Sequence, residues 1–158
     1  MTLGELWPNM RLLSRCLAVP GWLLAFLGMG AALFVAITSG LKVSSTLQII
    51  QVIGSTAAAL SIVFLACAVF SQPLDKPRSA RWQLSLSNEL PVMVRSFYFG
   101  ALMMLMGAIT FSVIGLFLVG GPTSQTLAFS QVFLTGACAS ALSYLLFSRA
   151  CSLDEPES

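Results

Sequence analysis

The sequence predicts an all-α membrane protein with four transmembrane helices arranged as two tandem hairpins. Of its 158 residues, 57% are hydrophobic and only 9% are charged, and the mean hydropathy is +0.89. A soluble domain carries roughly 25% charged residues, so this chain cannot cover a water-facing surface with them. The apolar residues also fall into four stretches, each at least as long as the roughly 20 residues that a membrane-crossing helix requires.

The four crossings are expected near residues 17–39, 46–71, 93–119 and 126–148. Residues 96–148 contain no charged side chain, and this run is interrupted in its middle by the sequence Gly120-Gly121-Pro122. Because Gly-Gly-Pro is a strong turn signal, the third and fourth helices should form a tight hairpin. The first apolar run is longer than the 7–15 residues typical of a signal-peptide core, so we expect it to be a retained helix.

The chain is expected to form a single integral membrane domain over residues 1–158. Its parts are a lead-in, a first hairpin, a cytoplasmic loop, a second hairpin and an acidic disordered tail, over residues 1–16, 17–71, 72–92, 93–148 and 149–158.

Each hairpin follows a segment with helical apolar spacing. In the lead-in, apolar residues recur at three- and four-residue steps and predict one helical face, formed by Leu3, Leu6, Trp7, Met10, Leu13 and Leu17. In the loop, Trp82, Leu86 and Leu90 repeat every four residues. We expect two short interfacial helices, before the first and third crossings, anchored by Trp7 and Trp82. An irregular loop is the alternative.

The basic residues predict the orientation. Seven of the eight fall on one side of the expected topology, namely Arg11, Arg15, Lys76, Arg78, Arg81, Arg95 and Arg149, and only Lys42 falls on the other. The positive-inside rule therefore places both termini in the cytoplasm, which means the inner (plasma) membrane if the protein is bacterial. Arg11 should face water or anionic lipid, whereas Arg15 and Arg95 should extend their long side chains to the headgroups.

The two hairpins resemble each other in sequence. Residues 29–37 and 106–114 agree at five of nine positions, and the pairs Thr46-Leu47 and Gln51-Val52 match Thr126-Leu127 and Gln131-Val132 at the same spacing. These matches predict an internal duplication whose copies share one orientation. The offset between the copies drifts along the chain, and chance similarity between apolar segments is the alternative.

Polar and small residues inside the spans are the candidate contacts between helices. Gln51 and Gln131 should lie in the outer part of the membrane, where an amide needs a partner and gains about 1 kcal/mol from it. We expect them to join helices, with each other as one option, and the alternative is that they line a polar pathway. The small residues that should permit close helix packing are Gly28, Gly30, Gly54, Gly107 and Gly136. Packing within the chain is favoured over a dimer face.

Several chemistries lack the residues that they need. The chain has no His, which excludes a Ser-His-Asp triad, imidazole-bound haem and a His-bearing zinc site. No carboxylate lies inside a span, and the four cysteines show no C-x-x-C spacing. We therefore expect no enzyme activity, no catalytic residue, no metal and no cofactor. The few basic residues beside apolar spans give no reason to expect nucleic-acid binding.

These features predict a non-catalytic structural or accessory subunit of a larger membrane complex, such as a secretion, conjugation or energy-transducing assembly. Its expected partners are the lipid bilayer, other membrane subunits and a second copy of itself. The alternative is a small oligomeric channel or transporter for a neutral solute, with Gln51 and Gln131 lining the pathway.

Overall fold

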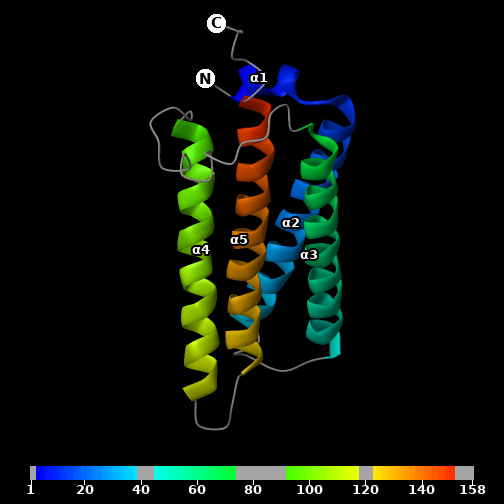
Figure 1. Ribbon diagram of the computed structural model, residues 1–158. Coiled ribbons are helices and arrows are strands. Elements are labelled where there is room, and N and C mark those ends of the chain that lie inside the picture. The colour runs from blue at the N-terminus through cyan, green and yellow to red at the C-terminus, as the bar shows by residue number, and fades with distance from the viewer. Residues whose placement is uncertain (1–2, 39–44, 74–91, 118–122, 152–158) are drawn as a thin grey trace, which may run out of the picture.

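The computed structural model describes residues 3–38, 45–73, 92–117 and 123–151, and nearly all of these residues are helical (Figure 1). In chain order the elements are α1 (Leu3–Leu6), the 3₁₀ helix η1 (Trp7–Asn9), α2 (Leu12–Thr38), α3 (Ser45–Ser71), α4 (Val92–Phe117) and α5 (Ser124–Cys151).

Four of these helices are long and apolar enough to cross a membrane. They contain 26 to 28 residues each, and the mean hydropathy of their most apolar windows ranges from 1.4 to 2.3. At 1.5 Å per residue, 26 residues extend about 39 Å, which exceeds the hydrocarbon core of about 30 Å. The prediction of an all-helical, multi-pass membrane protein is confirmed at this level.

The helix ends differ from the expected ones mainly at the start of α2 and the end of α5. Helix α2 begins at Leu12 rather than near residue 17, because its first turn already packs against α3 through Ser14, whose Oγ lies 2.8 Å from that of Ser71. Helix α5 continues to Cys151, so the prediction of a disordered tail is wrong for residues 149–151. Burial of Ala150 holds this last turn in place.

The prediction of one continuous apolar face in the lead-in is also wrong. Helix α1 has four residues and is followed by the three-residue helix η1, which contains Pro8, and the chain then becomes extended at Met10. Leu6 and Met10 are 1% and 2% exposed, whereas Leu13 is 61% exposed. The expected face is therefore divided between the protein core and its outer surface. The second expected interfacial helix, which contains Trp82, lies outside the described residues.

Helix α5 occupies the centre of the bundle (Figure 1). It packs against α2, α3 and α4, and α2 packs extensively on α3, whereas α4 packs mainly on α5. Helix α5 has the lowest mean hydropathy of the four long helices and also the most helical neighbours. Its hydroxyl and amide side chains find partners on α2, α3 and α4.

The two ends of the bundle differ in charge. The start of α2, the end of α3, the start of α4 and the end of α5 lie together at one end, beside α1 (Figure 1). The arginines of the described residues, Arg11, Arg15, Arg95 and Arg149, belong to these helix ends, so we name this the arginine end. The opposite half contains Gln51 and Gln131 and is named the glutamine end.

Candidate functional site

The two glutamines singled out in the sequence lie against each other. The Gln51 amide on α3 donates a hydrogen bond to the Gln131 side-chain oxygen on α5. Ser55 Oγ lies 3.1 Å from the same oxygen and 2.8 Å from the Gln51 carbonyl. Gln51 Oε1 and Gln131 Nε2 are covered by neighbouring atoms and have no hydrogen-bond partner among the described residues. The structure thus joins α3 to α5 through a small polar cluster at the glutamine end.

Gly28 and Gly54 mark the place where α2 and α3 cross most closely. A Cβ atom added at Gly28 would lie 2.9 Å from the Ala58 backbone nitrogen and 3.0 Å from the Gly54 carbonyl oxygen. A Cβ atom added at Gly54 would lie 2.7 Å from the Ala31 Cβ. Neither backbone atoms nor an alanine Cβ, which is fixed to the backbone, can move aside as the end of a flexible side chain can, so both positions require glycine for this approach.

The other three glycines have different surroundings. A Cβ atom at Gly107 on α4 would lie 2.6 Å from the ring of Phe133 on α5, so this glycine makes room for an aromatic ring. Gly136 on α5 faces the flexible ends of two methionines. Gly30 is exposed and has nothing within 4 Å of a built Cβ, so it does not pack against another helix of this chain.

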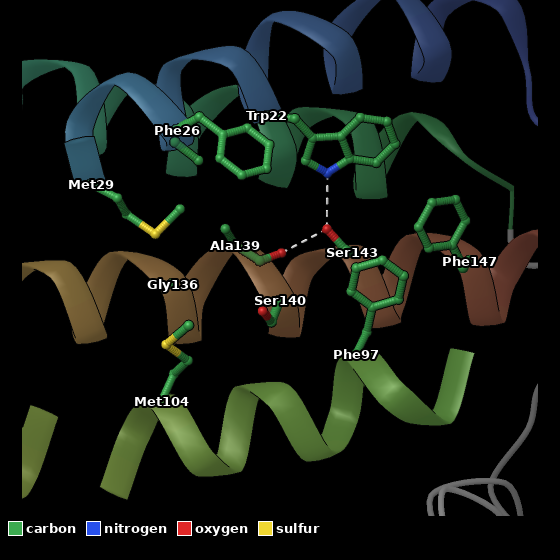
Figure 2. A pocket seen from close by; sticks show the side chains of 11 residues that line it. Trp22, Phe26, Met29, Phe97, Met104, Gly136, Ala139, Ser140, Ser143 and Phe147 are labelled. Carbon is green, nitrogen blue, oxygen red and sulfur yellow. Dashed lines mark hydrogen bonds between the residues drawn. The ribbon is translucent and has the colours of Figure 1, made fainter. Parts of the chain in front are cut away.

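An apolar groove of about 360 Å³ lies between α2, α4 and α5 (Figure 2). It exists because α2 and α4 flank α5 with little contact between them. The groove is lined by Trp22, Ala25, Phe26, Met29, Phe97, Met104, Gly136, Ala139, Ser140, Ser143 and Phe147. Its volume is within the range of about 300–1,000 Å³ that is usual for ligand sites.

Two of the polar groups in the wall of this groove already have partners. Trp22 Nε1 donates to Ser143 Oγ at 2.9 Å, and Ser143 Oγ donates to the Ala139 carbonyl at 2.7 Å (Figure 2). At the other end of the groove, a Cβ atom at Gly136 would lie 3.0 Å from Met104 Sδ and 3.4 Å from Met29 Sδ. Apolar rings and flexible thioethers therefore form most of the surface that the groove offers.

A row of aromatic rings extends from the groove toward the arginine end. The ring centroids of Trp7 and Trp22 are 6.3 Å apart, those of Trp22 and Phe147 are 5.8 Å apart, and those of Phe147 and Phe97 are 5.3 Å apart. The Arg15 guanidinium carbon lies 5.9 Å from the Trp7 ring centroid. The row thus connects η1, α2, α5 and α4, and it places a cation at its η1 end.

The four arginines at this end have different surroundings. Arg11 is exposed, and its backbone N–H donates to Gln72 Oε1 at 3.1 Å. Arg15 donates to the Met10 and Pro8 carbonyls at 2.8 and 2.6 Å. Arg95 lies in the first turn of α4. Arg149 donates to the Val69 carbonyl, which ties the end of α5 to α3.

Sequence reasoning missed Gln72 and Ser143. Gln72 is only 1% exposed, and its Nε2 donates to the Asn9 carbonyl at 3.3 Å, so it holds the lead-in against the end of α3. A polar residue directly after an apolar span is the available signal for such a role, but it does not identify the backbone group that the side chain reaches. Ser143 lies among other small residues of α5, and nothing in the sequence pairs it with Trp22.

No protein-family model matches the chain, and neither a curated protein nor a solved structure shows significant similarity to it.

Proposed function

We propose that this protein is a non-catalytic subunit of a larger membrane assembly and that α4 is the helix through which it joins other subunits. The observation that carries the proposal is the isolated position of α4. Only 11% of its most apolar window is buried within the chain, compared with 33% to 39% for the other three long helices. A helix held by a single neighbour leaves most of its circumference for another protein.

The outward face of α4 has a composition suited to such a contact. Large side chains recur opposite α5 at steps of three, four and seven residues, and Met103, Met106 and Phe117 are 70%, 65% and 83% exposed. Phe99 and Val113 continue the same stripe. Methionine side chains adapt to the shape of a facing helix, which favours packing against a partner. We name the stripe formed by Phe99, Met103, Met106, Val113 and Phe117 the α4 face.

Purification in a mild detergent tests the proposal. A tagged chain should be recovered with one or more membrane proteins in a fixed stoichiometry, measured by native mass spectrometry. Recovery as a lone monomer from membranes of its own cell would contradict the proposal. Recovery as a homo-oligomer that passes a neutral solute in liposomes would favour the channel alternative.

The glutamine cluster favours the subunit over the channel. A polar pathway requires side chains that face an open space, whereas Gln51 Oε1 and Gln131 Nε2 are covered. The cluster also joins α3 to α5, which are not consecutive helices in the chain. Within the proposed function, Gln51 and Gln131 hold the two halves of the chain together.

We further propose that the chain arose by duplication of a two-helix unit. The bond between Gln51 and Gln131 supports this proposal, because equivalent residues of two copies meet where a local twofold axis would pass. The contacts are not fully symmetric: α2 packs on α5, but α4 makes no comparable contact with α3. In the proposed assembly this asymmetry has a use, because α4 lies away from α3 and its outer face can contact a partner.

The proposed orientation places the arginine end in the cytoplasm, with both chain termini on that side. In a bacterial cell this corresponds to the inner membrane. Helices α1 and η1 would then lie at the cytoplasmic interface, where the half-buried Trp7 and the exposed Arg11 suit the boundary between hydrocarbon and headgroups.

A further inference from the structure

We infer that the thioethers of Met29 and Met104 bind one soft monovalent cation, of which Cu(I) is the biological example, at the end of the groove beside Gly136. This inference does not depend on the partner proposed for α4, because Met104 lines the groove, whereas Met103 and Met106 belong to the α4 face. The expectation of no metal rests on the lack of His and on the positions of the carboxylates and thiols, and it does not concern thioethers.

The two sulfur atoms converge on Gly136 from different walls of the groove. A Cβ atom built at Gly136 would lie 3.0 Å from Met104 Sδ and 3.4 Å from Met29 Sδ, so both sulfurs lie within 3.4 Å of one point. Met29 extends from α2 and Met104 from α4, and these two helices have little contact with each other (Figure 2). Because residue 136 is glycine, no side chain of α5 occupies that point. Two sulfur atoms from separate helices thus border one end of an open groove.

This pair of donors determines the class of ion that it can bind. A thioether is a soft, uncharged ligand, and soft sulfur ligands select Cu(I), whereas carboxylate and carbonyl oxygens suit Mg²⁺ and Ca²⁺. A thioether also needs no deprotonation before it binds a metal, unlike a thiol. Cu(I) and Ag(I) are stable with as few as two sulfur ligands in a nearly linear arrangement. Two facing thioethers therefore favour a soft monovalent cation over a divalent one.

The wall around the two sulfurs lowers the cost of a positive charge inside the membrane. Such a charge is expensive in hydrocarbon, and the residues that line the groove include no carboxylate to balance it. Phe26 lines the groove three residues before Met29 and is its neighbour on one face of α2. Ser140 lines the groove one turn after Gly136 on α5. An aromatic ring attracts a cation through its π electrons, and a hydroxyl oxygen offers a lone pair. The low charge of a monovalent ion suits these neutral groups.

Titration of the full chain with Ag(I) in a mild detergent tests this inference. Ag(I) is a soft monovalent cation like Cu(I), and it keeps its oxidation state without an added reductant. Thiols also bind such ions, so the parent variant for the titration has all four cysteines replaced by Ala, at positions Cys16, Cys67, Cys138 and Cys151. Isothermal titration calorimetry in a chloride-free buffer measures the number of Ag(I) ions per chain and their Kd.

The parent variant should bind one Ag(I) per chain. Met29→Leu and Met104→Leu should each weaken binding by at least about tenfold, because each removes one of the two ligands, and the loss of a mere outer-shell partner already costs about 10- to 100-fold. Met103→Leu is the matched control, because Met103 precedes Met104 on α4 but is 70% exposed on the α4 face, and it should leave the Kd unchanged. Cores tolerate the exchange of Met for Leu because it conserves volume, so weaker binding will not reflect misfolding.

X-ray absorption at the silver edge identifies the ligands directly. The parent variant contains no thiol, so every sulfur bound to silver belongs to a methionine. Its spectrum should show two sulfur neighbours, and the spectra of Met29→Leu and Met104→Leu should show one. The absence of Ag(I) binding in the parent variant would overturn the inference, as would a shell of oxygen and nitrogen alone. Equal weakening by Met103→Leu, or an unchanged Kd when Met29 and Met104 are both replaced by Leu, would also overturn it.

Discussion

Gln51 on α3 donates a hydrogen bond to Gln131 on α5, although 80 residues separate them in the chain. The bond joins the first pair of long helices to the second at the glutamine end. It is one of the contacts in which residues selected from the sequence meet in the structure, and the crossing at Gly28 and Gly54 is another.

Replacement of either glutamine by Leu should destabilise the bundle by about 1 kcal/mol, because the remaining amide loses its partner inside the membrane. The double variant should recover part of this loss, since it leaves no unpaired amide. A double-mutant cycle measured by unfolding in mixed micelles checks the coupling. Gln125→Leu is the matched control, because Gln125 is exposed on the same helix. Additive effects of the two substitutions would contradict the account of the pair.

Gly28→Ala should destabilise the chain by about 1–3 kcal/mol, the usual cost of overpacking. The added methyl group would meet the backbone of Ala58 and Gly54 and would force α2 away from α3. Gly30→Ala, two residues farther along α2, should be neutral or slightly stabilising, because its methyl group enters open space. Thermal unfolding of both variants in the same detergent checks the difference. Equal loss of stability would show that the two helices do not cross at Gly28.

Gln72→Leu should loosen the lead-in without unfolding the long helices. The substitution removes the bonds from Gln72 to the Arg11 N–H and the Asn9 carbonyl, and water at the membrane surface replaces only part of them. Hydrogen exchange in residues 6–12 should therefore become faster, while exchange in the middle of α3 stays unchanged. Ser96→Ala, at an exposed site of the same end, is the control. Unaltered exchange in the lead-in would mean that other contacts hold it.

Tags on both termini should be accessible from the cytoplasmic face alone. The prediction follows from the four arginines at one end of the described bundle and from the even number of long helices. Protease treatment of sealed inside-out vesicles should remove both tags, whereas right-side-out vesicles should protect both. Removal of the two tags from opposite faces would contradict an even number of crossings.

Much of the fold follows from composition and length, because a membrane imposes them directly. The positions of α3 and α4 differ from the expected ones by no more than about two residues at each end within the described part of the chain. The packing order was not predictable in the same way. All four long helices are apolar around most of their circumference, so periodicity does not show which face of α5 meets which neighbour.

For the candidate residues, too, the sequence predicted some contacts and not others. The equivalent spacing of Gln51 and Gln131 pointed to a pair, and an amide in hydrocarbon needs a partner. The sequence could not separate Gly28, which lies at a helix crossing, from Gly30, which faces open space, because both are glycines near the middle of one apolar helix. The groove depends on the distance between α2 and α4, and no residue pattern encodes that distance.

A photo-crosslinker placed on the α4 face tests the central claim most directly. Benzoylphenylalanine in place of Met106 should form one adduct of fixed mass with a protein partner in native membranes. The reason is that most of the α4 surface is exposed, and we propose that another subunit contacts it. The same group at Leu23, which is 65% exposed on α2, should react with lipid only. Lipid adducts alone at both positions would contradict the claim that α4 joins this chain to a larger assembly.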